Sequence, residues 1–413
     1  MKKITLKFTF VDFIKTILIL LIFYTIFEEF YIGPEIGNTL IWIIIYLIFM
    51  LFTSAKIYRT NFGKPILCLL VGIVIEIFLT SFVYGIDLIN LAYTWRWFFY
   101  IVLYFIFYDF CKNQNNRRAF IVVFTTCSLV LACLILAQGY SRSYISPEWF
   151  LNESAQDVGT EWRNGRVRLN LSPGLRMISF VYSYTYVVTS KKKKNLFLHI
   201  ANIVTTVLTF LFFDSTRMMI LIVIAFIAIT FWYGIHLSSK KITYFIKFAA
   251  ILAVVIAALY IISSDSGSIV SYIQGLVIST NEGSWYARIG AYLYYLKKAF
   301  DPPIMGIGLL MDDISGAWNL VHGPLGIYYA SDVGIIGTLA TTGWIATFSY
   351  LFIVLKVSYK AFSNHKKGEW SLQEGIALLM ISYLFTLSML DGQRIYMIPL
   401  CLTLYTYYGN FND

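Results

Sequence analysis

The sequence predicts an all-α fold, a polytopic helical bundle with about twelve transmembrane helices, organised as one membrane domain over residues 1–413. Hydrophobic residues make up 59% of the chain and charged residues 13%, a balance far from that of soluble globular proteins. Apolar stretches of about 18 or more residues recur along it. They are continuously apolar, without the alternation of membrane strands, so we expect helices.

The first apolar stretch follows the basic leader "MKKITLKFTFVDF". It is long and lacks a small-residue cleavage site, so we expect a retained helix. The five cysteines lie in or beside apolar stretches without a CxxC pair, which indicates neither a disulfide framework nor a zinc site. The expected spans are 9–29, 36–55, 65–84, 92–111, 118–139, 173–190, 195–213, 217–238, 243–263, 325–356, 370–390 and 394–410.

Lysine placement predicts the orientation of the bundle. With both termini in the cytoplasm, the basic segments "KIYRTNFGK", "KNQNNRR", "KKKK" and "SNHKKGE" all fall on the cytoplasmic side, as the positive-inside tendency requires. The net charge of +10 is therefore mostly a topology signal, and it does not indicate nucleic-acid binding.

Arginine follows a different pattern. Nine of the twelve arginines lie outside or at outer helix ends, namely Arg96, Arg142, Arg163, Arg166, Arg168, Arg176, Arg217, Arg288 and Arg394. A guanidinium is a planar fork that binds phosphate through two parallel hydrogen bonds, whereas lysine acts as a point charge. An anionic ligand at the outer membrane surface would explain this choice, although pairing with outer carboxylates is an alternative for any single arginine.

Arg217 is the most informative of these arginines. In "DSTRMMILIVIAF" it stands directly before an apolar run, where a charge is costly unless it faces a cavity or a partner. Glu76 lies well inside an expected span and is either a functional group or the partner of Arg96 in an ion pair that joins two helices.

Two outer segments are long, residues 140–172 and 264–324, and long loops in compact domains often carry function. The first contains Arg163, Arg166 and Arg168, and Arg176 follows it. In the second, helical spacing from Trp285 to Phe300 predicts an amphipathic helix at the membrane surface. Arg288 lies on that helix, and Asp301, Pro302 and Pro303 end it.

His322, near the end of the second loop, is the one histidine of four that the predicted topology places outside. An imidazole titrates near neutral pH and can serve as a general base. The alternative is that His322 is simply a polar residue on the surface of the loop. Asp312, Asp313 or Asp332 would be the base if His322 is not, whereas the adjacent pair Asp312 and Asp313 alone gives only weak evidence for a metal.

Several short motifs in the second half resemble the Wzy/O-antigen ligase superfamily of integral-membrane glycosyltransferases, whose fold is placed in the GT-C class. They are Ser215-Thr216-Arg217, Arg288, "PIMGIG" at 303–308, His322 and "DVGIIG" at 332–337. The resemblance covers about residues 205–345. Gly323 and Pro324 stand where the family often has Asn after the histidine, and Asp332 stands where Glu is common.

The resemblance implies a polymerase that joins polyprenyl-pyrophosphate-linked oligosaccharide repeat units on the outer face of the bacterial cytoplasmic membrane. We expect Arg217 and Arg288 to stabilise the leaving diphosphate, His322 to accept the proton, and no metal or cofactor to take part. Partners would be the lipid-linked donor and acceptor, membrane lipid, a chain-length regulator and a flippase. The further expected diphosphate ligands are Arg163, Arg166, Arg168 and Arg176.

Two other functions fit much of the same pattern. A ligase would move the finished glycan onto another acceptor through the same donor chemistry. A flippase for lipid-linked oligosaccharide would also present arginines to a diphosphate, but we expect it to carry charges through the middle of its bundle and to contain an internal repeat. In this chain the charges gather at one face and beside the long loops.

Overall fold

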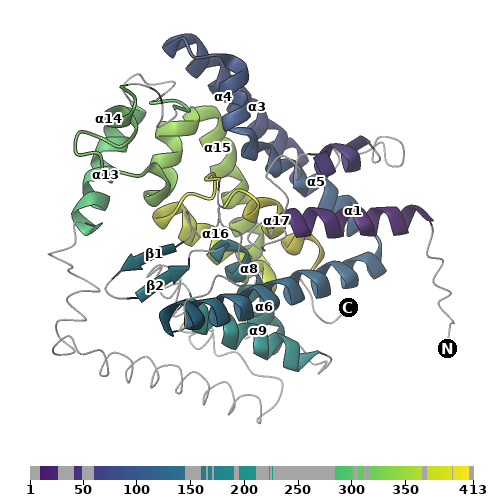
Figure 1. The fold of residues 1–413 in the computed structure, drawn as a ribbon. Coiled ribbons are helices and arrows are strands. Elements are labelled where there is room, and N and C mark those ends of the chain that lie inside the picture. Colours follow the sequence, from purple (N-terminus) through teal and green to yellow (C-terminus); the bar gives the residue numbers. More distant parts are fainter. Residues whose placement is uncertain are drawn as a thin grey trace, which may run out of the picture.

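The computed structural model describes most of the chain (Figure 1). The described residues are 10–26, 41–48, 60–144, 160–163, 166–169, 172–189, 195–210, 223, 226, 284–300, 306–310, 314, 316–364, 370–392 and 394–408. The expected spans 217–238 and 243–263 lie outside them, apart from two residues.

Helices dominate this part of the chain, and a short helix at residues 41–48 falls within the expected second span. The other helices are α1 (Phe10–Ile26), α3 (Gly63–Tyr84), α4 (Leu88–Thr94), α5 (Leu103–Phe110), α6 (Gln114–Tyr144), α8 (Pro173–Thr189), α9 (Leu196–Thr209), α13 (Ser284–Ala299), α14 (Trp318–Val321), α15 (Gly334–Ser363), α16 (Leu372–Thr386) and α17 (Met397–Tyr407). Two 3-10 helices, η2 (Arg96–Val102) and η4 (Ala330–Asp332), lie between them.

Three of the described helices are long and apolar enough to cross a membrane: α3, α6 and α15. Helix α4 and the segment Arg96–Phe110, bent by 58° at Trp95, together make a fourth candidate span. Helices α9, α16 and α17 are shorter and apolar. The chain is therefore a helical membrane protein, while the number of about twelve spans remains a prediction.

Helices α3 and α15 form the most extensively packed pair among the described elements. A Cβ at Gly72 would lie 2.6 Å from the backbone nitrogen of Ala346, so the glycine lets the two backbones approach closely. The opposite face of α3 is apolar and open, with Val71 and Phe78 each 55% exposed and Phe82 87% exposed. Such a stripe at helical spacing suits contact with lipid tails.

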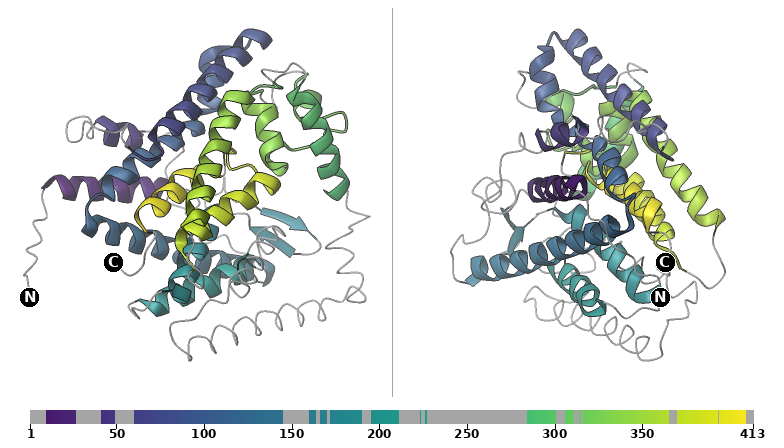
Figure 2. Two further views of the ribbon diagram at one scale, coloured as in Figure 1. Left: turned by 180° about the vertical axis from the view of Figure 1, so that it is seen from behind. Right: turned by 90° about the vertical axis from the view of Figure 1, so that its right-hand side faces the viewer.

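Two further groups of helices complete the bundle. Helices α6 and α9 pack together at the end of the molecule opposite α14 (Figures 1 and 2), and α8 packs on both. Asn202 of α9 donates to the hydroxyls of Ser179 and Ser183 on α8, at 2.6 and 2.9 Å. Helix α13 packs against α15 and carries the segment that contains His322.

A short antiparallel hairpin is an exception to the all-α prediction. Strand β1 (Thr160–Arg163) pairs with β2 (Arg166–Leu169), with Arg163 opposite Arg166. The two residues between these partners in the sequence are Asn164 and Gly165, a dipeptide that favours two-residue hairpin turns. The sequence therefore contained a local signal for this element.

The tenth expected span, 325–356, begins too early. Helix α15 starts at Gly334, and the preceding residues form turns and the 3-10 helix η4. Gly326 has a φ of 66°, which favours a turn over a helix. Residues 325–333 are apolar in composition but form a loop, in which Leu325, Ile327 and Tyr329 are exposed.

Replacement of Gly72 by valine should destabilise the bundle. The added side chain meets the Ala346 backbone, which has no flexible end to move aside, and overpacking of this kind costs about 1–3 kcal/mol. Thermal unfolding in detergent should show a lower midpoint for Gly72→Val. Val71→Leu, one residue away on the exposed face, is the control and should unfold at the wild-type temperature; equal midpoints for both variants would contradict the close packing of α3 on α15.

Candidate functional site

A non-helical segment, residues 306–310, crosses the end of the bundle where α3 ends and α15 begins. Both backbone polar groups of Ile307, its N–H and its C=O, have hydrogen-bond partners. The Ile307 amide donates to the Ala340 carbonyl at 2.7 Å, and the Tyr84 hydroxyl donates to the Ile307 carbonyl at 3.1 Å. Gly306 has a φ of 68°, and a Cβ there would lie 2.4 Å from the Ala340 oxygen, so only glycine permits this approach.

Leu309, two residues further on, is held in the same way. Its amide donates to the Thr80 hydroxyl at 3.0 Å, and its carbonyl accepts from the indole nitrogen of Trp95 at 2.8 Å. Non-helical backbone within a membrane bundle is stable only when its polar groups find partners in the protein. Helix α3, helix α15 and the turn at Trp95 supply those partners here, so the backbone of the segment is held in one position.

A kink in α15 frees the acceptor of one of these hydrogen bonds, the Ala340 carbonyl. Gly343 has φ 71° and ψ 177°, a backbone conformation that is essentially restricted to glycine. Because a break leaves the carbonyls before it without their usual helical donors, the Ala340 carbonyl is available to Ile307. The kink in α15 and the position of the segment 306–310 therefore depend on each other.

Tyrosines of α13 hold the segment that carries His322. The Tyr295 hydroxyl donates to the Val321 carbonyl at 2.6 Å and lies 3.0 Å from the Tyr328 carbonyl. The Tyr294 hydroxyl donates to the Leu320 carbonyl at 2.6 Å. The predicted amphipathic helix at Trp285–Phe300 coincides with α13, and this helix acts as a support for the loop.

The His322 side chain is 4% exposed and held in one orientation. Its Nδ1 lies 2.9 Å from the Tyr328 carbonyl oxygen. Because a carbonyl oxygen only accepts, Nδ1 is the donor, and in the neutral ring Nε2 carries the lone pair. The rings of Trp318 and Tyr329 flank the imidazole, with centroids 4.3 and 4.8 Å from it. The tautomer that a general base requires is thus fixed by the fold.

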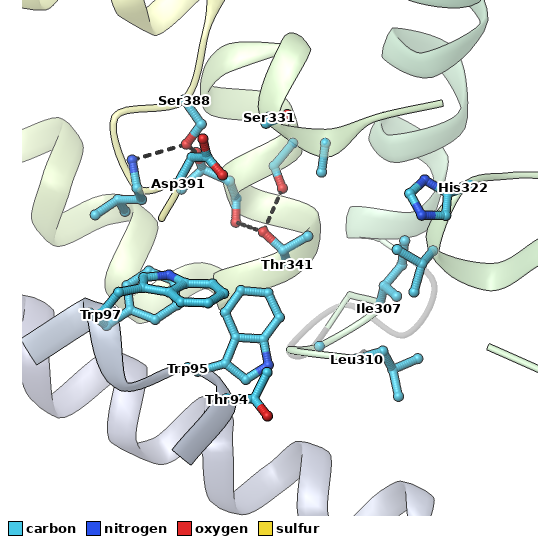
Figure 3. Close-up of a pocket in the computed structure, with 17 residues that line it drawn as sticks. Thr94, Trp95, Trp97, Ile307, Leu310, His322, Ser331, Thr341, Ser388 and Asp391 are labelled. Carbon is cyan, nitrogen blue, oxygen red and sulfur yellow. Dashed lines mark hydrogen bonds between the residues drawn. The ribbon is translucent and has the colours of Figure 1, made fainter. Parts of the chain in front are cut away.

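His322 lines a cavity of about 450 Å³ (Figure 3). His322 lies on one side of this space and Trp95 and Trp97 lie on the other, with Thr341 between them. Its lining combines an imidazole, a carboxylate, two indoles and several hydroxyls. The polar and aromatic lining residues are Thr94, Trp95, Trp97, Phe98, His322, Ser331, Thr338, Thr341, Ser388 and Asp391.

The carboxylate of the cavity, Asp391, is paired with Arg394, with Nη1 of the arginine 3.2 Å from Oδ2. The same Nη1 lies 3.4 Å from each of the Ser331 and Ser388 carbonyls. Arg394 is 9% exposed. One guanidinium therefore joins the loop before α15 to the loop after α16 and fixes the carboxylate between them.

Among the arginines predicted to bind the diphosphate, Arg288 is connected to the cavity lining through Asp332, which follows the lining residue Ser331. It is on α13, with Nη2 at 4.0 Å from Oδ2 of Asp332, and both side chains are 35% exposed. A long ion pair between partly exposed groups contributes little to stability, so Arg288 can exchange Asp332 for a stronger anionic partner.

Arg394 is the predicted outer arginine in direct contact with the lining, through Asp391, whereas the other arginines predicted to bind the diphosphate do not line the cavity where the structure describes them. Arg176 is fully buried on α8, where it donates to the Thr209 hydroxyl at 2.6 Å and lies 5.1 Å from the centre of the Phe210 ring. Arg163, Arg166 and Arg168 are on the hairpin, in β1 and β2. Arg217 lies outside the described residues, as do Asp312 and Asp313.

The expected ion pair between Glu76 and Arg96 is not formed. Arg96 instead donates to the Tyr93 carbonyl at 2.8 Å and lies 4.0 Å from the centre of the Tyr93 ring. Because Tyr93 is on the adjacent turn of the chain, it accepts this one hydrogen bond at a lower cost in side-chain ordering than a residue on another helix, while Nε of Arg96 has no hydrogen-bond partner among the described residues. Glu76 is 3% exposed, and its Oε1 has no hydrogen-bond partner among the described residues.

Sequence reasoning missed most of the cavity. Trp95 and Trp97 flank Arg96 at the start of an expected span, and Ser388 and Asp391 occupy a short outer connection in "LSMLDGQR". A polar cluster between two apolar spans was the available signal for Asp391. Trp95 and Trp97 gave none, because tryptophan at a membrane boundary is most often an anchor.

Comparison with known proteins adds no relative: no family model, no curated protein and no solved structure matches this chain.

Removal of the Tyr295 hydroxyl should loosen the loop that carries His322. In Tyr295→Phe the Val321 carbonyl loses its donor, whereas the Tyr328 carbonyl keeps the Nδ1–H of His322. A carbonyl left without a donor in this way costs about 1–3 kcal/mol. Hydrogen exchange followed by mass spectrometry should show faster exchange in residues 317–329. Tyr359→Phe, at a site that is 76% exposed, is the control, and exchange in Tyr295→Phe that is as slow as in this control would contradict the supporting role of α13.

Proposed function

We propose that this protein is a glycosyltransferase that joins polyprenyl-diphosphate-linked oligosaccharide repeat units at the outer face of the bacterial cytoplasmic membrane. The observation that carries the proposal is the cavity, which places the buried, oriented imidazole of His322 beside hydroxyls, indoles and the Asp391 carboxylate. A general base close to groups that suit a sugar fits an acceptor hydroxyl awaiting activation.

The lysine pattern supports an outer location for the cavity. Helix α3 begins beside Lys64, and α15 has Lys360 in its last turn, whereas the cavity lies at the opposite ends of these two helices. Lysines favour the cytoplasmic ends of transmembrane helices. A lipid-linked glycan displayed on the outer leaflet would reach the cavity from that side.

The reaction is one nucleophilic substitution. The acceptor hydroxyl oxygen attacks the anomeric carbon of the donor, the bond from that carbon to the diphosphate oxygen breaks, and polyprenyl diphosphate leaves with the electron pair. The hydroxyl proton passes to Nε2 of His322. Because the leaving group departs as a stable anion, fixed positive charge is the main requirement for catalysis.

Among the described residues we assign this charge to Arg288, since its partner Asp332 follows Ser331 of the cavity lining. In the proposal Arg217 joins it, and Arg163, Arg166, Arg168 and Arg176 serve as further diphosphate ligands on the path of the lipid. Because its guanidinium is buried against Thr209 and Phe210, Arg176 also has a structural role.

The proposal is tested by reconstitution of the full chain in liposomes with a synthetic polyprenyl-diphosphate repeat unit. A ladder of products indicates a polymerase, and a single transferred product indicates a ligase. Movement of the lipid across the bilayer without a covalent product indicates a flippase and overturns the proposal.

His322→Ala should abolish transfer in this assay. The variant removes the base but leaves the arginines, so binding of the lipid-linked donor, measured by sedimentation with the proteoliposomes, should remain at the wild-type level. An active alanine variant would move the base role to Asp312, Asp313 or Asp332.

Arg288→Lys should slow transfer on the order of 10²-fold to 10³-fold, as expected when a preorganised contact to transition-state charge is lost. Lysine keeps the charge but cannot form two parallel hydrogen bonds with one phosphate. The same exchange at Arg217 is expected to act alike. Arg118→Lys, at an exposed position near the start of α6, is the control and should transfer at the wild-type rate. Full product length and yield in Arg288→Lys, at normal protein level, would refute its role.

A further inference from the structure

The charges that line the cavity suit one part of a lipid-linked glycan, its uncharged sugar, better than the other part, its diphosphate. Among its described lining residues are one carboxylate, Asp391, and no lysine or arginine. Arg394 neutralises that carboxylate from behind. A diphosphate placed there would face no cation and one carboxylate, which is unfavourable in a partly buried site. The lining therefore suits an uncharged polar ligand.

Trp97 offers this ligand a hydrogen-bond donor. Its indole nitrogen is shielded from solvent and has no hydrogen-bond partner among the described residues, although the side chain lines the cavity. The neighbouring Trp95 differs, because its own indole nitrogen donates to the Leu309 carbonyl. A buried donor without a partner costs about 1–3 kcal/mol, and a ligand that accepts a hydrogen bond would recover this.

The two indoles also form an apolar surface. The ring centres of Trp95 and Trp97 are 4.9 Å apart and the planes are inclined by 64°. Trp97 lies against Gly392, where a Cβ would be 3.1 Å from the ring, and Gly392 follows Asp391 directly in the chain. The Trp97 ring, whose N–H is without a partner among the described residues, and the Asp391 carboxylate thus lie in the same part of the cavity lining.

A neutral pyranose ring matches this combination. One face of the sugar carries C–H groups that pack on an aromatic ring, and its edge carries hydroxyls that both donate and accept. An ionised carboxylate has about four lone-pair sites, so Asp391 can bind Arg394 and still accept hydrogen bonds from sugar hydroxyls. Thr341 lies between these groups and His322.

We propose that the cavity is the subsite for the acceptor sugar, that it selects an uncharged pyranose, and that Trp97 and Asp391 determine this selectivity while the diphosphate binds outside it, beside Arg288. As an acceptor subsite it rests on the transferase proposal, but its capacity to bind a sugar does not need the donor. The two ideas can therefore fail separately.

Binding is tested on the purified full chain in nanodiscs without any donor. The probes are the methyl pyranosides of glucose, galactose, mannose and N-acetylglucosamine, followed by saturation-transfer NMR, with methyl glucuronide and inorganic pyrophosphate as anionic probes. We expect at least one neutral glycoside to bind, and pyrophosphate not to displace it. Absence of binding by every neutral glycoside, or displacement by pyrophosphate, would overturn the subsite.

Variants assign the binding to the two residues. Trp97→Phe keeps an aromatic ring and removes the N–H, and Asp391→Asn removes the charge; each should weaken binding about tenfold, as the loss of one buried hydrogen bond predicts. Trp344→Phe is the matched control, because its indole donates to the Ala299 carbonyl and does not line the cavity. Wild-type affinity in both Trp97→Phe and Asp391→Asn would overturn the assignment.

The transfer assay separates this result from the wider proposal. With a neutral glycoside that binds in the NMR experiment supplied as the acceptor, Trp97→Phe should raise the KM for that glycoside about tenfold and leave the KM for the lipid-linked donor unchanged. A product ladder with unaltered acceptor KM in both variants would retain the transferase and reject the subsite. Sugar binding without any product would retain the subsite as a glycan-binding site and reject the transferase.

Discussion

The hydrogen bonding of five residues, 306–310, is the constraint from which the rest of this end of the molecule follows. Backbone that is not helical must find all its partners inside a membrane bundle. Here the partners are Ala340, Tyr84, Thr80 and Trp95. To supply them, α15 bends, α3 approaches closely, and the chain turns at Trp95 between α4 and η2. The cavity occupies the space beside this arrangement.

The charged and titratable groups at the cavity are of two kinds, those fixed in its lining and one that is held more loosely outside the lining. The groups that line it, His322 and Asp391, are each fixed by a partner outside it, a carbonyl for the imidazole and a guanidinium for the carboxylate. Arg288, whose partner Asp332 follows the lining residue Ser331, has a long ion pair as its one ionic contact among the described residues. Oriented groups within and a more loosely held cation outside the lining suit a ligand that is neutral at one end and anionic at the other.

Hydropathy predicted much of the helical framework, because the apolar length needed to cross a bilayer is visible in a linear sequence. It located α3, α6, α8 and α9 to within a few residues. It failed at the start of α15, where residues 325–333 form turns and a 3-10 helix. There the signal was local, in Gly326, whereas the hydropathy pattern averages over many residues.

The candidate site was predictable only in part. His322 and Arg288 could be found because each is an unusual residue in its segment, and a charged or titratable group stands out in an apolar chain. Asp391, Trp95 and Trp97 come from connections far away in sequence, and their meeting with His322 depends on the packing of α3, α15 and α16. No spacing within one segment encodes that meeting. The hairpin was predictable from Asn164 and Gly165, a dipeptide typical of two-residue turns.

The bend at Gly343 has a consequence for how this chain can vary. Gly343 and Gly306 serve a single contact, since the first exposes the Ala340 carbonyl and the second lets the Ile307 amide reach it. A side chain at either position removes the benefit of glycine at the other. Natural variants should therefore retain both glycines or lose both together, and a straight α15 should be accompanied by a different path for the segment at 306–310.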